Sequence, residues 1–168
     1  AEPDVDGVLH HDGEVLTSER VQQEIEVTLL REGHTLDETI VACGPQAAKP
    51  HERGHGPLYE DESVIVDIFP RSKSTGYHAD MTRTFVVGEP SDTVQEWYDM
   101  TEEALDAALD ELEGGVLGSV VHGAACDVYE DAGLRTLRSD EAAETGFIHS
   151  TGHGVGLDIH EYPRLSEQ

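Results

Sequence analysis

The sequence has few basic residues. Lysine and arginine together number 10 against 36 aspartates and glutamates, which gives a formal net charge of −26, and the only lysines are Lys49 and Lys73. Such a charge should repel nucleic acid and anionic membranes, so neither is an expected partner. It should also strain the compact state unless salt screens it, and the screening length falls to about 3 Å at molar salt. The composition therefore predicts a halophilic protein from a high-salt cytoplasm.

Cysteines and long apolar runs are also scarce. Cys43 and Cys126 are the only cysteines, and both have apolar neighbours, which favours reduced core residues over a disulfide. No apolar run reaches membrane-spanning length and the amino terminus does not resemble a signal peptide, so a cytoplasmic location is expected. With 168 residues, 37% of them hydrophobic, the chain should form one domain, residues 1–168, with a real core.

Apolar residues recur with helical and strand spacing along the chain, which argues against disorder. Ser18 is the predicted cap of the first helix, Trp97 and Tyr98 of the second helix are predicted core residues, and His122 is placed on the polar side of the third. This order of elements favours an α+β fold, with helices packed on an antiparallel sheet. The predicted helices are 16–33, 90–113 and 119–132, and the predicted strands are 39–43, 63–69 and 76–87.

Two aspartates lie in strands that should pair as a hairpin. Asp67 interrupts the apolar run Ser-Val-Ile-Val-Asp-Ile-Phe, and Asp80 lies in the following strand. A carboxylate inside such a run is costly unless it is neutralised or coordinated, and two carboxylates on one face call for cations. Either aspartate could instead pair with Arg83 or cap a turn. His78 shares the face of Asp80 by alternation but is not assigned as a ligand.

Three histidines lie close together near the carboxyl end, in a segment rich in glycine. His149, His153 and His160 are candidate metal ligands or proton carriers, because neutral imidazole serves both roles near neutral pH. The glycines exclude a helix. Residues 157–160 alternate as a short strand, and a turn at 154–156 would bring His153 and His160 to one cavity. The alternative is a glycine-rich loop with solvated histidines.

A further histidine follows a proline. Pro50 biases its predecessor, Lys49, towards extended geometry, so His51 is expected on a stiff edge rather than on a helix. The alternative is an ordinary loop histidine.

These motifs resemble one known family. Val-Asp-Ile at Asp67, Ala-Asp-Met-Thr-Arg-Thr-Phe at Asp80, and Thr-Gly-His-Gly-Val-Gly-Leu-Asp-Ile-His-Glu-Tyr-Pro-Arg around His153 are similar to the pita-bread metallopeptidases, which include methionine aminopeptidase, Xaa-Pro aminopeptidase and prolidase. The resemblance runs from about Thr17 to the last residue. It implies the pita-bread fold and two divalent ions, manganese, cobalt or zinc. Asp67 would hold one ion, Asp80 would bridge both, and His153 would hold the other.

The resemblance also implies an activity, hydrolysis of Xaa-Pro bonds in proline-containing peptides. Two ions about 3.5–4 Å apart would share a water and lower its pKa so that it attacks as hydroxide. His160 would contact the substrate and steady the tetrahedral intermediate, and His51 would help to bind the substrate. His149 matches a substrate-pocket histidine of Xaa-Pro aminopeptidases and favours the proline-directed branch. Both a dipeptidase and an aminopeptidase fit the motifs, and a homodimer is compatible with them.

The sequence departs from the family pattern in two ways. Asp80 follows Asp67 by 13 residues, two more than is usual in the family, and an even insertion should keep the side-chain faces in register. The family's two further glutamate ligands lie downstream of the point where this chain stops, at Gln168. We therefore expect a truncated domain that binds metal weakly and turns over slowly or not at all. The alternatives are a metal-free peptide-binding module and a creatinase-like amidinohydrolase.

Overall fold

The computed structural model describes residues 1–167, so that Gln168 lies outside the described residues. The chain divides into two units: residues 1–92 with 155–159 form unit 1, and the rest of the described chain forms unit 2. Each unit has its own hydrophobic cluster. None of the helices in residues 1–167 is both long and apolar enough to cross a membrane.

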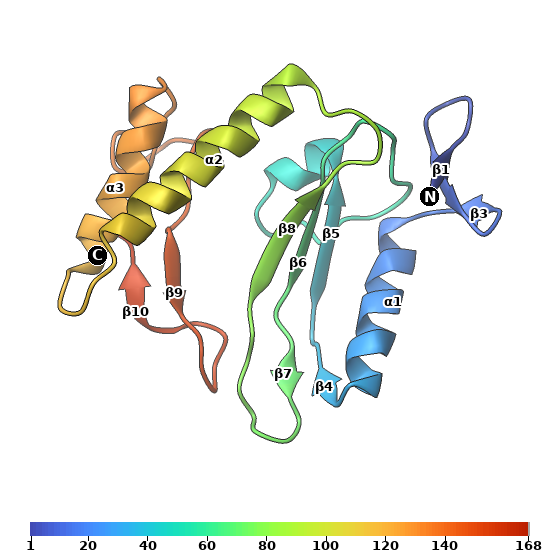
Figure 1. Ribbon diagram of the computed structural model, residues 1–168, viewed down its shortest axis with the longest axis horizontal. Coiled ribbons are helices and arrows are strands. Elements are labelled where there is room, and N and C mark those ends of the chain that lie inside the picture. The colour runs from blue at the N-terminus through green and yellow to red at the C-terminus, as the bar shows by residue number, and fades with distance from the viewer. Residues whose placement is uncertain (168) are drawn as a thin grey trace. The chain divides into compact units, whose positions relative to one another are not determined.

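Unit 1 is built around the three-stranded sheet β5-β6-β8, in which both neighbouring pairs are antiparallel (Figure 1). The three predicted strands are present as β5 (Thr39–Cys43), β6 (Val64–Ile68) and β8 (Met81–Phe85). The third is shorter than the predicted 76–87, so Asp80 lies just before the strand rather than in it. The other elements are β1 (Glu2–Pro3), β2 (Leu9–His11), β3 (Glu14–Val15), α1 (Ser18–Arg31), β4 (His34–Thr35), η1 (Gly44–Ala48) and β7 (Arg71–Ser72).

The core of unit 1 lies between α1 and β5, which run side by side in Figure 1. Apolar residues spaced along α1, including Val21 and Ile25, pack against the buried Val41 and Cys43 of β5 and Val64 of β6. Such spacing places apolar side chains on one helical face, which explains why this segment packs on the sheet as a helix.

The amino-terminal cap of α1 differs from the prediction. The cap is Thr17 rather than Ser18, because the Thr17 hydroxyl accepts a hydrogen bond from the Arg20 amide at 3.3 Å. Ser18 is instead the first helical residue and is fully buried. The sequence signal was ambiguous because serine and threonine both favour the cap position.

Removing this cap should destabilise the protein modestly. Thr17→Ala is expected to lower the free energy of unfolding by about 1 kcal/mol, because one of the first helical amides loses its acceptor. Urea unfolding followed by circular dichroism measures the change. Thr28→Ala, at an exposed position within α1, is the control and should change stability by only a few tenths of a kcal/mol. Equal losses for both variants would contradict the assigned cap.

Unit 2 contains the helices α2 and α3 and a short hairpin (Figure 1). Its elements are α2 (Asp92–Asp110, which begins at the last residue of unit 1), α3 (Gly118–Asp131), β9 (Gly152–Gly154) and β10 (Glu161–Leu165). Both helices were predicted within a few residues. Their common cluster is formed by small residues, Ala104 and Ala108 of α2 with Val121, Ala125 and Cys126 of α3, together with Phe147.

The prediction that Trp97 and Tyr98 of α2 are core residues is wrong. Trp97 and Tyr98 are 58% and 53% exposed, whereas Ala104 and Ala108 are buried. The helix therefore packs through alanines, whose small side chains let the neighbouring helix come close. Apolar spacing alone could not distinguish this face from the aromatic one. Both cysteines, Cys43 and Cys126, are buried and unpaired as predicted.

Glu130, in the last turn of α3, makes hydrogen bonds that depend on its charge and should be sensitive to acid. Arg138 donates to both carboxylate oxygens of Glu130, and the buried hydroxyl of Thr136 donates to the same carboxylate. These hydrogen bonds, chiefly those from Arg138, lower the pKa of Glu130 below the ordinary 4.5. A lowered pKa contributes stability that is present above the unfolded-state value and is lost as the pH falls through the folded-state value.

Glu130→Gln should therefore flatten the pH dependence of stability on the acid side. Relative to wild type, the variant is expected to lose stability at neutral pH and little or none at a pH well below 4.5, where both carry a neutral side chain at this position. Urea unfolding at the two pH values measures this difference. The exposed Glu24 of α1 provides the control, Glu24→Gln. A Glu130→Gln deficit that persists unchanged at low pH would contradict the charge-based contribution.

Candidate active site

The hairpin of β6 and β8 carries the first candidate site residue, Asp67, in unit 1. Asp67 of β6 is directly opposite Thr82 of β8, and the Thr82 hydroxyl donates to Asp67 Oδ1 at 2.6 Å. The two side chains therefore share one face of the sheet. Asp80 is exposed, lies just before β8 and precedes Thr82 by two residues, so strand alternation predicts the same face for it. Asp67 is half-buried rather than fully buried.

Asp67 accepts a hydrogen bond from Thr82, and the Arg83 guanidinium makes a different contact. Arg83 is opposite Val66 and its guanidinium donates to the carbonyl of Thr82 at 2.7 Å. The Asp67 carboxylate thus accepts a hydrogen bond from the Thr82 hydroxyl. Thr82 was not among the predicted site residues. The register of the hairpin together with strand alternation could have placed it opposite Asp67. Its hydroxyl fixes one oxygen of Asp67, as neighbouring residues commonly do for metal-binding carboxylates.

His51 also lies in unit 1, in an exposed turn after η1. The preceding Lys49 has φ −109° and ψ 109°, so the predicted extended conformation before Pro50 is confirmed. This turn presents the imidazole of His51 to solvent, where a substrate could reach it.

The turn at residues 155–159 belongs to unit 1. The His78 amide donates to the carbonyl of Gly156 at 2.8 Å, and His78 Nδ1 donates to the carbonyl of Phe69 at 3.3 Å. His78 therefore holds the backbone at Gly156 and Phe69. It was not predicted to be a metal ligand. The prediction of a strand at residues 157–160 is wrong: the segment bends, and the Gly156 amide bonds the carbonyl of Asp158 at 3.1 Å. The alternation of apolar and polar residues in this segment could not reveal the hydrogen bond that bends it.

The hairpin of unit 2 carries two further candidate residues. His153 is the central residue of β9 and His160 directly precedes β10, and their ring centroids are 4.3 Å apart in an edge-to-face arrangement. The prediction that a turn brings these two histidines together is confirmed. Gly154 explains part of the glycine pattern, because a Cβ there would lie 2.5 Å from the Tyr162 carbonyl oxygen of β10. Only glycine allows the two strands to approach so closely.

The imidazoles of His153 and His149 are held in a defined tautomer. His153 Nδ1 is 3.0 Å from the Gly154 carbonyl oxygen, and His149 Nδ1 is 2.8 Å from that of Ser150. A carbonyl only accepts, so Nδ1 carries the proton and Nε2 carries the lone pair, which is the form in which imidazole binds a metal. His149 is exposed and its ring meets that of Phe147 edge-on. Each unit therefore carries side-chain atoms of the kinds that bind divalent ions.

The prediction that His122 lies on the polar side of α3 is wrong. His122 is only 4% exposed and packs beside Phe147, with ring centroids 5.6 Å apart. Two of its polar partners, Thr151 and Glu167, are far away in the sequence, so local spacing did not reveal its burial.

A comparison with solved structures identifies the fold. The Xaa-Pro dipeptidase from Bacillus anthracis matches with a TM-score of 0.79 and 31% sequence identity, over 91% of this chain and 41% of that chain. The predicted α+β pita-bread fold is confirmed by this likeness and by others to prolidase structures. The chain is therefore similar in fold to a class of metal-dependent peptidases.

Sequence comparison gives the same result. The sequence model of metallopeptidase family M24 matches residues 6–168, and the chain belongs to this family. The probable dipeptidase PepE of Mycobacterium tuberculosis is 38% identical over 154 residues, which are 89% of this chain and 38% of the relative. The Xaa-Pro dipeptidase of Lactobacillus delbrueckii is 34% identical over 158 residues, covering 90% and 39%. The chain thus spans less than half the length of these relatives.

Proposed function

We propose that the protein hydrolyses Xaa-Pro peptide bonds with the help of two divalent metal ions. The observation that carries the proposal is the Asp67–Thr82 hydrogen bond across β6 and β8, because it holds a carboxylate at a position where the family's motif has a metal ligand. Relatives named Xaa-Pro dipeptidase support the substrate class.

The proposed metal ligands are Asp67, Asp80 and His153. Aspartate oxygens and an imidazole nitrogen suit manganese, cobalt or zinc. Support for this set comes from the motifs, because the chain belongs to metallopeptidase family M24 and all three residues match positions that the family's motifs give to metal ligands. The ions, when bound, would polarise the scissile carbonyl and lower the pKa of the attacking water.

The remaining histidines are proposed to act on the substrate. His160 would donate a hydrogen bond to the oxyanion that develops at the scissile carbonyl, and His51 would help to hold the peptide. The edge-to-face contact with His153 restricts the ring of His160, so that its orientation is set before the substrate binds. His149, exposed beside Phe147, would line the pocket for the proline ring.

The assay of the complete polypeptide on an Xaa-Pro dipeptide tests this function. Hydrolysis should require manganese or cobalt, stop with a chelator and return when metal is restored, whereas the matching Xaa-Leu dipeptide should be cleaved much more slowly. Chelator-insensitive cleavage of a guanidino substrate would instead indicate creatinase-like chemistry. Peptide binding without cleavage would indicate a metal-free module.

The proposal extends to the organisation and setting of the protein. Residues 1–168 are proposed to be part of one catalytic domain that acts in the cytoplasm, with a homodimer as its assembly, and the net charge of −26 favours a cytoplasm of high salt.

If charge repulsion strains the fold, the melting temperature should rise as potassium chloride increases from about 0.1 M, where the screening length is about 10 Å, to about 1 M, where it is about 3 Å. Sucrose at equal osmolality is the control, since it does not screen charge. An equal rise in sucrose would contradict electrostatic stabilisation.

A further inference from the structure

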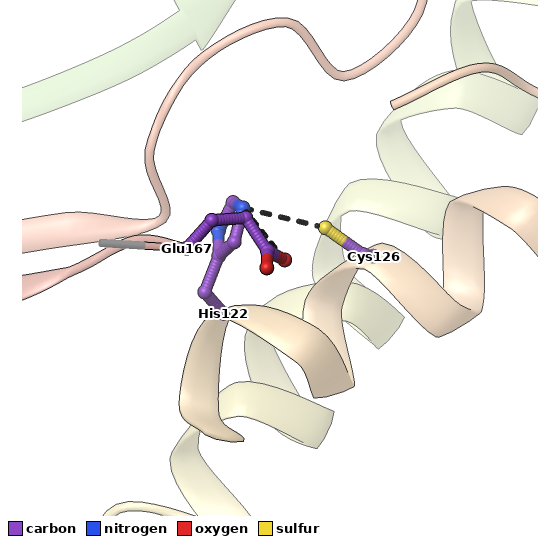
Figure 2. Close-up of side chains that lie close together, drawn as sticks. All are labelled: His122, Cys126 and Glu167. Atoms are coloured by element: carbon purple, nitrogen blue, oxygen red, sulfur yellow. Dashed lines mark hydrogen bonds and ion pairs between the residues drawn. The ribbon is translucent and has the colours of Figure 1, made fainter. Parts of the chain in front are cut away.

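A buried histidine and a buried cysteine lie one turn apart on α3. His122 is 4% exposed and Cys126 is fully buried, and His122 Nε2 is 3.5 Å from Cys126 Sγ. Glu167, which follows β10, points towards the same place, with its Oε1 3.9 Å from His122 Nε2 (Figure 2). These atoms of the three side chains all lie within 4.8 Å of one another, and all three residues belong to unit 2.

The His122 ring is held from its other side. His122 Nδ1 is 2.8 Å from the Thr151 hydroxyl oxygen, which can accept a hydrogen bond from Nδ1–H while Nε2 keeps its lone pair. A hydrogen-bond partner on the second ring nitrogen is typical of metal-binding histidines. Phe147 packs beside the ring and helps to fix its orientation.

The protonation states suit a cation that displaces a proton. Burial lowers the pKa of the His122 imidazole and raises the pKa of the Cys126 thiol, so without metal the imidazole is neutral and the thiol is protonated. A divalent ion would release the thiol proton to solvent as the sulfur–metal bond forms. The resulting thiolate and the Glu167 carboxylate would balance the charge of the ion inside the core.

The geometry is close to that of a tetrahedral zinc site. Zinc bonds of about 2.0–2.3 Å imply ligand atoms about 3.3–3.8 Å apart, near the observed 3.5 and 3.9 Å. We propose that His122, Cys126 and Glu167 bind one zinc ion, with solvent at the fourth position on the exposed side of Glu167. A thiolate with an imidazole favours zinc over manganese or magnesium. The ion would join the end of β10 to α3, and none of its three ligands is a residue proposed for the peptidase centre.

Cobalt titration of the 168-residue chain, without a histidine tag, tests this site. Cobalt(II) bound to a thiolate gives a charge-transfer absorption band that carboxylate and imidazole ligands do not give. We expect one cobalt per chain with this band, displaced by zinc. Cys126→Ser should abolish the band, whereas Cys43→Ser, the other buried cysteine, should retain it. Asp67→Asn should also retain it, which separates this site from the peptidase centre.

Cys126→Ser changes a buried residue and could prevent folding. A variant of the more exposed Glu167 therefore provides a second test of the zinc site. Glu167 has a side chain that is 46% exposed, so Glu167→Gln should fold normally and bind zinc at least about 10-fold more weakly, as expected when one ligand is replaced. Zinc should raise the melting temperature of wild type more than that of this variant. Absence of the thiolate band, its survival in Cys126→Ser, or equal zinc affinity in Glu167→Gln would overturn the proposal.

Discussion

Asp67→Asn is expected to reduce hydrolysis of an Xaa-Pro dipeptide by the complete polypeptide at least about 100-fold, since replacing even the neighbours of a metal ligand costs about 10–100-fold. The amide has the shape of the carboxylate and can still accept the Thr82 hydroxyl, so the fold should survive. What it lacks is the negative charge that binds a divalent ion. Higher manganese concentrations should restore little of the activity.

Two further variants calibrate this expectation. Thr82→Val removes the hydrogen bond to Asp67 while keeping the carboxylate, and should cost about 10–100-fold in activity or metal affinity. Asp99→Asn, in α2, replaces an exposed aspartate that accepts from Gln95 and should leave activity unchanged. Steady-state kinetics over a range of manganese concentrations measures all three. Wild-type activity in Asp67→Asn would rule out Asp67 as a ligand.

Gly54→Ala is expected to cost about 4 kcal/mol or more, among the largest effects of single substitutions. Gly54 has φ +83°, and a Cβ built there would lie 1.7 Å from the carbonyl oxygen of the buried Val41 in β5. The Val41 amide also donates to the Arg53 carbonyl at 2.9 Å, so the loop is bonded to the strand and cannot retreat easily. Because domains are typically stable by about 5–15 kcal/mol, such a loss would remove a large share of the stability.

Gly56→Ala is the matched control in the same loop. Gly56 has φ +76°, but a Cβ there would have no heavy atom within 4 Å among the atoms that the structure places. This variant tests the left-handed backbone without the clash and should lose about 1–2 kcal/mol. Urea unfolding in high salt, followed by circular dichroism, measures both. Similar losses in the two variants would show that conformation, rather than the clash with β5, dominates.

The sequence predicted much of unit 1 because its strands have local signals. The apolar run of β6 and the strand that follows it after a short loop predicted a hairpin, and the Asp67–Thr82 pair confirms that pairing. The helices were found from apolar spacing, which depends only on neighbours within two turns. The closeness of His153 and His160 followed from the glycines between them.

The errors arise where contacts are made between distant parts of the sequence. The segment 157–160 alternates like a strand, yet a bend closed by Gly156 and Asp158 and tied to His78 replaces it. Trp97 and Tyr98 have the spacing of core residues, yet α2 packs through its alanines. In both cases the local pattern was compatible with two arrangements, and packing selected one.

The sequence by itself determined which residues can do chemistry and which of them a short hairpin brings together, because strand alternation and glycine turns act over a few residues. Only the tertiary structure decided that His122 is buried, that its partners are Thr151, Cys126 and Glu167, and that Thr82 supports Asp67. Thr151 and Glu167 are 29 and 45 residues from His122 in the chain. Such contacts depend on how α3 packs against β10, which no local periodicity encodes.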